Sequence, residues 1–240
     1  MPTINIEKIN KRDYRCSEAY KTLRTNIQLC GSDMKVIMFT SSTPNEGKSS
    51  VSFNLAVSLA ESGKKVIFID ADLRKSVLVG RYKINKAIKG LTHYLSGMNK
   101  FDEVICTTNV ENLYTVFSGI VPPNPSELLN NNSFDTLIKA LRDIYDYVII
   151  DTPPLGSVTD ASIVAQKCDG AVLVVAANMV SYKFVQKSLE QLKLTQCKIL
   201  GCVLNKVDLS GDGYYGKYYG KYYGKYYGKY YGKYGEHAGK

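Results

Sequence analysis

The sequence predicts an α/β protein built on a doubly wound, mostly parallel sheet. Short apolar, β-rich segments alternate with segments of helical spacing along most of the 240 residues. This alternation is typical of a parallel sheet with helical crossovers. One strand also leads through a tight turn into a helix that carries most of a phosphate-binding motif.

The elements are expected in regular alternation. Strands are predicted at residues 36–39, 65–69, 112–117, 147–150, 171–176 and 199–204. Helices are predicted at 17–27, from Ser50 to a stop at Gly63, between Gly90 and Gly97, at 134–141, and around Phe184, Leu189 and Leu192. Residues 121–129 read as a stiff turn with a helix start, and the first residues of the chain as an irregular polar segment.

The phosphate-loop candidate lies between the first strand and the helix that begins at Ser50. Its second half reads Glu46-Gly47-Lys48-Ser49, whereas Ser42 stands where the GxxxxGK[ST] motif has its first glycine. An ordinary strand, turn and helix is the alternative, but a lysine in the first helical turn opposes the helix dipole unless an anion occupies the turn. We expect a nucleotide to contact Ser42, Pro44, Asn45, Glu46, Gly47, Lys48, Ser49 and Ser50.

Two later strands end in carboxylates. Asp70-Ala71-Asp72-Leu73-Arg74 follows one apolar run, and Asp151 ends another. In open α/β sheets ligands collect at the carboxyl ends of the strands. Near a Mg²⁺-phosphate site, positioning of metal and water explains these carboxylates better than helix capping does. Asp151 resembles the Walker B carboxylate, which holds Mg²⁺ or its water opposite the hydroxyl of the loop.

The last strand leads into Asn205-Lys206-Val207-Asp208, which matches the NKxD of GTPases. A GTPase would also carry DxxG after the Walker B strand, where this chain has Asp151-Thr152-Pro153-Pro154. We therefore keep Asn205 as a base contact without guanine specificity.

Composition points to a soluble, cytoplasmic protein. The longest apolar run, 171–177, is too short to span a bilayer, and the N-terminus lacks the apolar stretch of a signal peptide. Six cysteines occur without a CxxC pair, so neither a zinc site nor a disulfide framework is indicated. Residues 214–240 hold six lysines and one glutamate and contribute +5 of the net charge of +9. The rest of the chain carries only +4, a weak argument for nucleic acid as a partner.

The C-terminal residues form a low-complexity tail. Five consecutive Tyr-Tyr-Gly-Lys units begin at Tyr214, and the tail holds 11 of the 19 tyrosines. Without aliphatic residues it is expected to be disordered. Tyrosines between lysines could alternatively stack on single-stranded nucleic acid. A flexible segment of 27 residues has an r.m.s. span of about 30 Å, and a domain of some 210 residues a radius of gyration of about 17 Å.

These motifs together resemble the bacterial tyrosine kinases (BY-kinases) of capsular and exopolysaccharide synthesis, specifically the stand-alone cytoplasmic kinase of Gram-positive bacteria. The P-loop NTPase fold of that family has a Walker A motif, matched by 42–49, a Walker A′ motif, matched by 70–74, and a Walker B motif, matched by 151–153. The segment 122–129 and the tyrosine-rich C-terminus also look like the family. The related cell-division and partition ATPases carry a signature lysine where this chain has Thr43.

The resemblance implies an ATP-dependent tyrosine autokinase that uses Mg²⁺. Its catalytic residues would be Lys48, Asp70, Asp72 and Asp151, with Ser49, Asp70 and Asp151 at the metal and Arg74 and Asn205 added to the nucleotide contacts. The proton acceptor would be Asp72 or Asp70. The phosphoacceptors, supplied in trans, would be Tyr214, Tyr215, Tyr218, Tyr219, Tyr222, Tyr223, Tyr226, Tyr227, Tyr230, Tyr231 and Tyr234. A P-loop ATPase switch without kinase activity is the main alternative.

The resemblance also implies partners. The ring-forming ExxRxxR helix of the family falls on Glu18, Lys21 and Arg24, where lysine replaces the middle arginine. From spacing alone, that helix would be a solvated amphipathic helix. A membrane activator of the polysaccharide co-polymerase type would hold the kinase at the inner face of the membrane, and a protein-tyrosine phosphatase is expected. We predict an N-terminal segment at 1–34, a kinase domain at 35–213 and the tail at 214–240.

Overall fold

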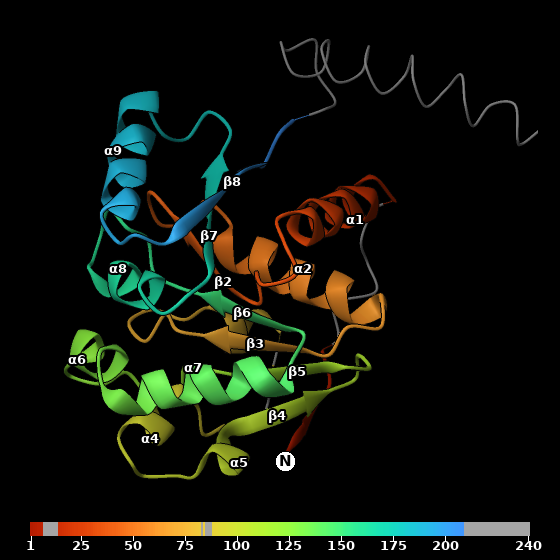
Figure 1. Cartoon of the computed structure of the whole chain (residues 1–240), viewed down its shortest axis with the longest axis vertical. Coiled ribbons are helices and arrows are strands. Elements are labelled where there is room, and N and C mark those ends of the chain that lie inside the picture. The colour runs from red at the N-terminus through yellow and green to blue at the C-terminus, as the bar shows by residue number, and fades with distance from the viewer. Residues whose placement is uncertain (7–13, 83, 85–87, 209–240) are drawn as a thin grey trace, which may run out of the picture.

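The computed structural model describes residues 1–6, 14–82, 84 and 88–208 (Figure 1). Its strands are β1 (Thr3–Ile4), β2 (Val36–Ser41), β3 (Val66–Asp70), β4 (Ile105–Thr108), β5 (Leu113–Val116), β6 (Tyr147–Asp151), β7 (Gly170–Ala176) and β8 (Lys198–Asn205). Its helices are α1 (Tyr14–Leu29), α2 (Lys48–Glu61), α3 (Leu78–Arg81), α4 (Leu91–Leu95), α5 (Phe101–Val104), α6 (Pro125–Leu129), α7 (Asn132–Ile144), α8 (Asp160–Ala165) and α9 (Tyr182–Lys193).

The described strands form a single sheet in the order β1-β4-β5-β3-β6-β2-β7-β8. All of their pairings are parallel except β4 with β5, which confirms the predicted mostly parallel α/β fold. The expectation of an irregular polar N-terminus is wrong for Thr3–Ile4, because these residues pair with Thr107 and Thr108 of β4. A two-residue strand is too short to produce a readable hydrophobic period.

Helices cover both faces of the sheet, with α1 and α2 on one side and α7 on the other (Figure 1). Alternate residues of the central strands face the two sides, so that Ile37 and Phe68 join the α2 side, whereas Met38 and Ile67 join the α7 side. Strands β2, β3 and β6 are buried on both faces except at the half-exposed first residue of β6. This double burial explains why their sequences are continuous apolar runs.

The register of the central strands determines where the site lies. Asp70, the last residue of β3, is the partner of Asp151, the last residue of β6. Asp151 is also the partner of Phe39 in β2, whose strand leads directly into the predicted phosphate loop. Both carboxylates and the loop therefore meet at one edge of the sheet.

At the opposite end of the strands, Asp169 fixes the beginning of β2. Its carboxylate accepts hydrogen bonds from the backbone N–H groups of Lys35 and Val36, at 3.0 and 2.8 Å. It also forms an ion pair with Arg142 of α7. This single side chain therefore ties α7, β2 and β7 together far along the strands from the loop.

None of the helices in the described part of the chain is long and apolar enough to cross a membrane. All six cysteines of the sequence belong to this part, and their thiols are free. Cys106 is buried and Cys16 is exposed.

We predict that Asp169→Asn lowers the free energy of unfolding by about 2 kcal/mol, because a charged acceptor of three donors becomes neutral. Urea denaturation measures this loss. Asp143→Asn, an exposed change on α7, is the control and should stay within about 0.5 kcal/mol of the original chain. Equal midpoints for both variants would contradict the assigned role of Asp169.

Candidate functional site

The loop between β2 and α2 needs a glycine at position 47 for two reasons. Gly47 is the N-cap of α2 and has a φ of 93°, in the left-handed region that favours glycine. A Cβ at this position would lie 2.1 Å from the Nδ2 atom of Asn205. The amide of Asn205 can approach the loop only because position 47 has no side chain.

Neighbouring strands hold the loop in shape. The buried carboxylate of Glu46 accepts hydrogen bonds from the backbone N–H groups of Thr43, at 2.6 Å, and Ala176, at 3.0 Å. From the end of β8, the amide of Asn205 donates to the Glu46 carbonyl at 2.9 Å, and the ammonium of Lys206 donates to the Asn45 carbonyl at 2.6 Å. The Glu46 side chain thus shapes the loop, and Lys206, which the sequence analysis quoted only as part of the NKxD match, supports it.

The serine at the first motif position fits this backbone. Ser42 is not among the residues with positive φ, so its position does not require glycine. Its hydroxyl is fully buried and has no hydrogen-bond partner in the described structure. Thr92 and Thr115 have buried hydroxyls of the same kind, so this observation by itself does not indicate a ligand. Pro44 and Asn45 are exposed on the outside of the loop.

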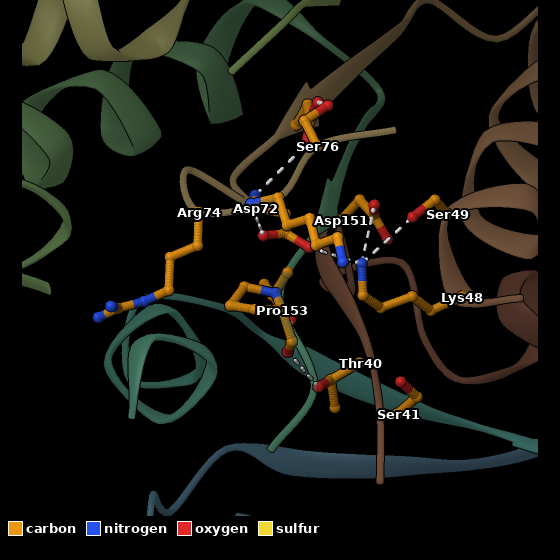
Figure 2. A network of polar contacts seen from close by, with 12 residues as sticks. Thr40, Ser41, Lys48, Ser49, Asp72, Arg74, Ser76, Asp151 and Pro153 are labelled. Atoms are coloured by element: carbon orange, nitrogen blue, oxygen red, sulfur yellow. Dashed lines mark hydrogen bonds and ion pairs between the residues drawn. The ribbon is translucent and has the colours of Figure 1, made fainter. Parts of the chain in front are cut away.

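Lys48 is the centre of the site (Figure 2). Its ammonium lies 3.2 Å from Asp72 Oδ2, 3.4 Å from Asp151 Oδ2 and 3.2 Å from the Ser49 hydroxyl. Asp70 completes a group of three buried carboxylates beside this one lysine. The structure thus brings together all four predicted catalytic residues, which come from three different strand ends.

The charges of this cluster do not balance. Burial lowers the pKa of Lys48, but the nearby carboxylates of Asp151, Asp72 and Asp70 outweigh it and raise that pKa. Burial, with the negative charge of Asp151, raises the pKa of Asp70 to about 7. Burial also raises the pKa of Asp151, against the opposing effect of Lys48. When its carboxyl groups are ionised, the cluster carries three negative charges and one positive charge, and a cation would neutralise the excess.

Two serines that the sequence analysis missed contact the acidic residues. Ser76 donates a hydrogen bond to Asp70, and Ser52 donates to Asp151 Oδ1 at 3.3 Å. Ser52 lies about one helical turn after Ser49, so the spacing of the two serines could have placed Ser52 on the same face of the helix as Ser49. Nothing in the sequence pattern marked Ser76.

Arg74 points away from the phosphate loop (Figure 2). Its guanidinium forms two hydrogen bonds with Asp160, at 2.8 and 2.9 Å, and one with the Ser126 hydroxyl at 3.0 Å. At the loop itself, a different arginine, Arg81 of α3, contacts the hydroxyl of Ser50. The contact of Arg74 with a nucleotide thus stays a prediction, for which this arrangement gives no support.

The predicted oligomerisation residues are engaged within the chain. Lys21 forms an ion pair with Glu18 at 2.7 Å, on the exposed side of α1. Arg24 donates to the Ser58 carbonyl of α2 at 2.7 Å. Their role between subunits stays a prediction, as do the proposed tail acceptors, which lie outside the described residues together with the predicted boundary at residue 214.

The donor atoms suit a magnesium ion bound together with a nucleotide. In the described residues, no group of three or more His, Cys, Asp and Glu side chains is arranged to hold a metal by itself. Mg²⁺ is usually held by one or two carboxylates, with phosphate oxygens and waters completing its shell. Asp70 and Asp151, with the hydroxyl of Ser49, provide such a partial set. The excess of negative charge in the cluster agrees with this assignment.

The sheet, the loop after β2 and the carboxylates after β3 and β6 define a P-loop nucleotide-binding protein. Residues 34–203 match the family model described as "AAA domain". The chain is also similar to the septum site-determining protein MinD of Pyrococcus horikoshii, solved with Mg-ADP. That likeness has a TM-score of 0.63 and 28% identity, and covers 73% of this chain and 72% of the other.

More specific relatives are tyrosine kinases. The chain is 48% identical over 208 residues to tyrosine-protein kinase CpsD of Streptococcus agalactiae, covering 85% of this chain and 91% of that protein. It is 40% identical over 205 residues to YwqD of Bacillus subtilis, covering 83% and 86%. The kinase domain of Escherichia coli tyrosine kinase ETK matches with a TM-score of 0.81 and 32% identity, covering 87% and 83%. The chain belongs to the bacterial tyrosine-protein kinases.

We predict that Asp70→Asn stabilises the protein without nucleotide and Mg²⁺ above pH 7. An unfolded carboxyl ionises near pH 4, whereas Asp70 in the folded protein has a pKa of about 7. Folding stability therefore falls as the pH rises between these values, by up to about 4 kcal/mol. Asparagine removes this loss, so the variant should gain stability at pH 8 and the gain should vanish near pH 4.

Urea denaturation of both proteins between pH 4 and 8 measures this difference. A constant difference across the range would show that Asp70 does not carry an elevated pKa. Asp146→Asn, which changes a carboxylate outside the site, controls for the general effect of losing one charge.

Proposed function

We propose that this chain is an ATP-dependent protein-tyrosine autokinase that phosphorylates its own C-terminal tyrosine cluster. The observation that supports this most directly is Lys48, buried at the start of α2 among Asp72, Asp151 and Asp70. The lysine at a phosphate loop can offset the charge of the phosphates, and a carboxylate beside it can accept the proton of the incoming hydroxyl group. Family membership and the 11 tail tyrosines indicate tyrosine as the acceptor.

The transfer requires one bond to form and one to break. The tyrosine oxygen attacks the γ-phosphorus of ATP, the bond from that phosphorus to the β,γ-bridging oxygen breaks, and ADP leaves with its electron pair. The hydroxyl proton passes to the carboxylate of Asp72 or Asp70. Lys48 moves from these carboxylates toward the β- and γ-phosphates, where its charge offsets that of the transferring group.

Asp70, Asp151 and Ser49 would hold Mg²⁺, which when bound supplies charge neutralisation at the phosphates. Ser76 and Ser52 then orient the two carboxylates through their hydroxyl groups. The backbone N–H groups of the loop, kept in place by Glu46 and Asn205, surround the phosphate oxygens.

The orientation of Asn205 favours adenine over guanine. Because its amide nitrogen donates to the Glu46 carbonyl, its carbonyl oxygen is left to accept a hydrogen bond. The 6-amino group of adenine is a donor, whereas the 6-oxo group of guanine is an acceptor. A base that presents its 6-substituent to Asn205 is therefore matched when it is adenine.

The acceptor tyrosines would come from a neighbouring subunit of a ring. Glu18, Lys21 and Arg24 of α1 are the proposed ring contacts, which would exchange or share their present partners. The span expected for a flexible tail exceeds the radius of gyration expected for the domain, so a tail can reach the next site. Each phosphate adds about −1.5 to −2 charges, so four modified tyrosines would offset the tail's +5.

In the cell, we propose that the kinase regulates the polymerisation and export of capsular or exopolysaccharide. A membrane activator of the polysaccharide co-polymerase type would bind it at the inner face of the membrane, and a protein-tyrosine phosphatase would reverse the modification. The relative named "Putative tyrosine-protein kinase in cps region" from Klebsiella pneumoniae, 36% identical over 201 residues that cover 83% of this chain and 28% of that protein, supports this context.

We predict that Mg²⁺ and labelled ATP label the tail tyrosines, and that the activator's cytoplasmic segment increases the rate. Lys48→Met should reduce labelling by about 100-fold or more, because it removes the central charge. Lys64→Met removes an exposed lysine in the segment between α2 and β3 and should leave labelling unchanged. Phosphopeptide mass spectrometry identifies the labelled tyrosines.

Replacing all 11 tail tyrosines by phenylalanine should abolish the label without affecting nucleotide binding. If ATP is hydrolysed but tyrosine is never labelled, even with the activator segment, the autokinase proposal fails and an ATPase switch takes its place.

We also predict that ATP binds more tightly than GTP by roughly tenfold or more, because guanine would set two acceptors against each other at Asn205. Competition of each nucleotide against a fluorescent ADP analogue measures the ratio. Equal affinities would contradict a base position at Asn205.

A further inference from the structure

Three side chains from separate elements form a closed hydrogen-bonded cluster at the carboxyl edge of the sheet. Asp160, at the start of α8, accepts two hydrogen bonds from the guanidinium of Arg74, at 2.8 and 2.9 Å. The hydroxyl of Ser126, on α6, donates to the same Asp160 carboxylate at 2.6 Å and accepts from Arg74 at 3.0 Å. This two-point geometry fixes the plane of the guanidinium.

The carboxylate of Asp160 is more deeply buried than the guanidinium of Arg74. The side chain of Asp160 is 0% exposed, whereas that of Arg74 is 40% exposed. Burial works against ionisation of Asp160, but the hydrogen bonds from Arg74 and Ser126 outweigh it and lower its pKa. A buried carboxylate that loses its partner is strongly unfavourable, so Arg74 is held in place by Asp160.

The cluster is connected to the catalytic carboxylates through a short turn. Arg74 lies two residues after Asp72, whose Oδ1 accepts from the Lys75 backbone N–H at 3.0 Å. The backbone N–H of Asp72 in turn donates to Asp70 Oδ1 at 3.3 Å. The same Asp72 carboxylate contacts Lys48 at 3.2 Å through its other oxygen. Fixing Arg74 therefore fixes the turn from which Asp72 reaches Lys48.

We propose that Asp160, assisted by Ser126, is a positioning residue for phosphoryl transfer, which acts by holding Arg74 and with it the turn at residues 70–75. The proposal rests on the proposed kinase function and gives Arg74 a role other than contact with the nucleotide. It also assigns a task to the segment at 122–129, because Ser126 belongs to it and connects α6 to the turn.

The chain offers a matched control in a second ion pair. The side chains of Asp169 and Arg142 are 14% and 37% exposed, close to the values for Asp160 and Arg74. This second pair lies at the opposite end of the strands. Asp160→Asn and Asp169→Asn each neutralise a carboxylate that holds an arginine. Both variants should lower the melting temperature, but only the first should disturb Asp72.

The experiment uses the full chain with Mg²⁺ and the activator segment, well below both melting temperatures. Asp160→Asn should lower the rate of tyrosine labelling at saturating ATP by about tenfold to 100-fold, because a small displacement of a catalytic group is costly. Its affinity for a fluorescent ADP analogue should change by less than about threefold, since the loop contacts remain. Arg74→Lys keeps the charge but loses the two-point contact, and should give an intermediate rate.

Three results would overturn the proposal. One is a labelling rate for Asp160→Asn within twofold of the original chain. Another is an equal loss of rate in Asp169→Asn, which would indicate general destabilisation. The third is a loss of ADP-analogue affinity as large as the loss of rate, which would make Arg74 a nucleotide contact. If the original chain labels no tyrosine, the proposed function itself fails, and the same comparison is made on the rate of ATP hydrolysis.

Discussion

The position of the Lys48 ammonium among buried carboxylates is the constraint on which the site depends. One lysine faces Asp72 and Asp151 at hydrogen-bonding distances, with Asp70 close by. Without a ligand, this arrangement keeps more negative than positive charge away from water, which is unfavourable for stability. The same excess becomes useful when a cation and phosphates enter, because the groups are already in place and need little reorganisation.

The parallel sheet makes this arrangement possible. Because β6 lies between β2 and β3, the register brings the last residues of β3 and β6 side by side, next to the strand that leads into the loop. Contacts outside the cluster then fix each segment. Glu46 and Asn205 hold the loop from the β7 and β8 side, and Asp160 holds the turn after β3 through Arg74. The site is thus positioned by buried and partly buried hydrogen bonds from several elements.

Much of this was predictable because apolar strands followed by motif residues leave a strong sequence pattern. The six predicted strands all appear, and the residues of the loop and the two acidic strand ends meet as expected. Strands β1 and β4 were missed because they are only two and four residues long. Asp160 and Ser76 were missed because their importance comes from tertiary contacts, which no local period reveals. Arg74 belongs to a motif, but its direction depends on a partner 86 residues away.

The central claim is that the excess negative charge around Lys48 is a site for a divalent cation bound together with a nucleotide. The most direct measurement is calorimetric titration of the full chain with ADP, with Mg²⁺ and with EDTA in its place. We expect Mg²⁺ to tighten ADP binding by about tenfold or more, since it neutralises Asp70 and Asp151 beside the phosphates. Equal or tighter binding without Mg²⁺ would contradict the account.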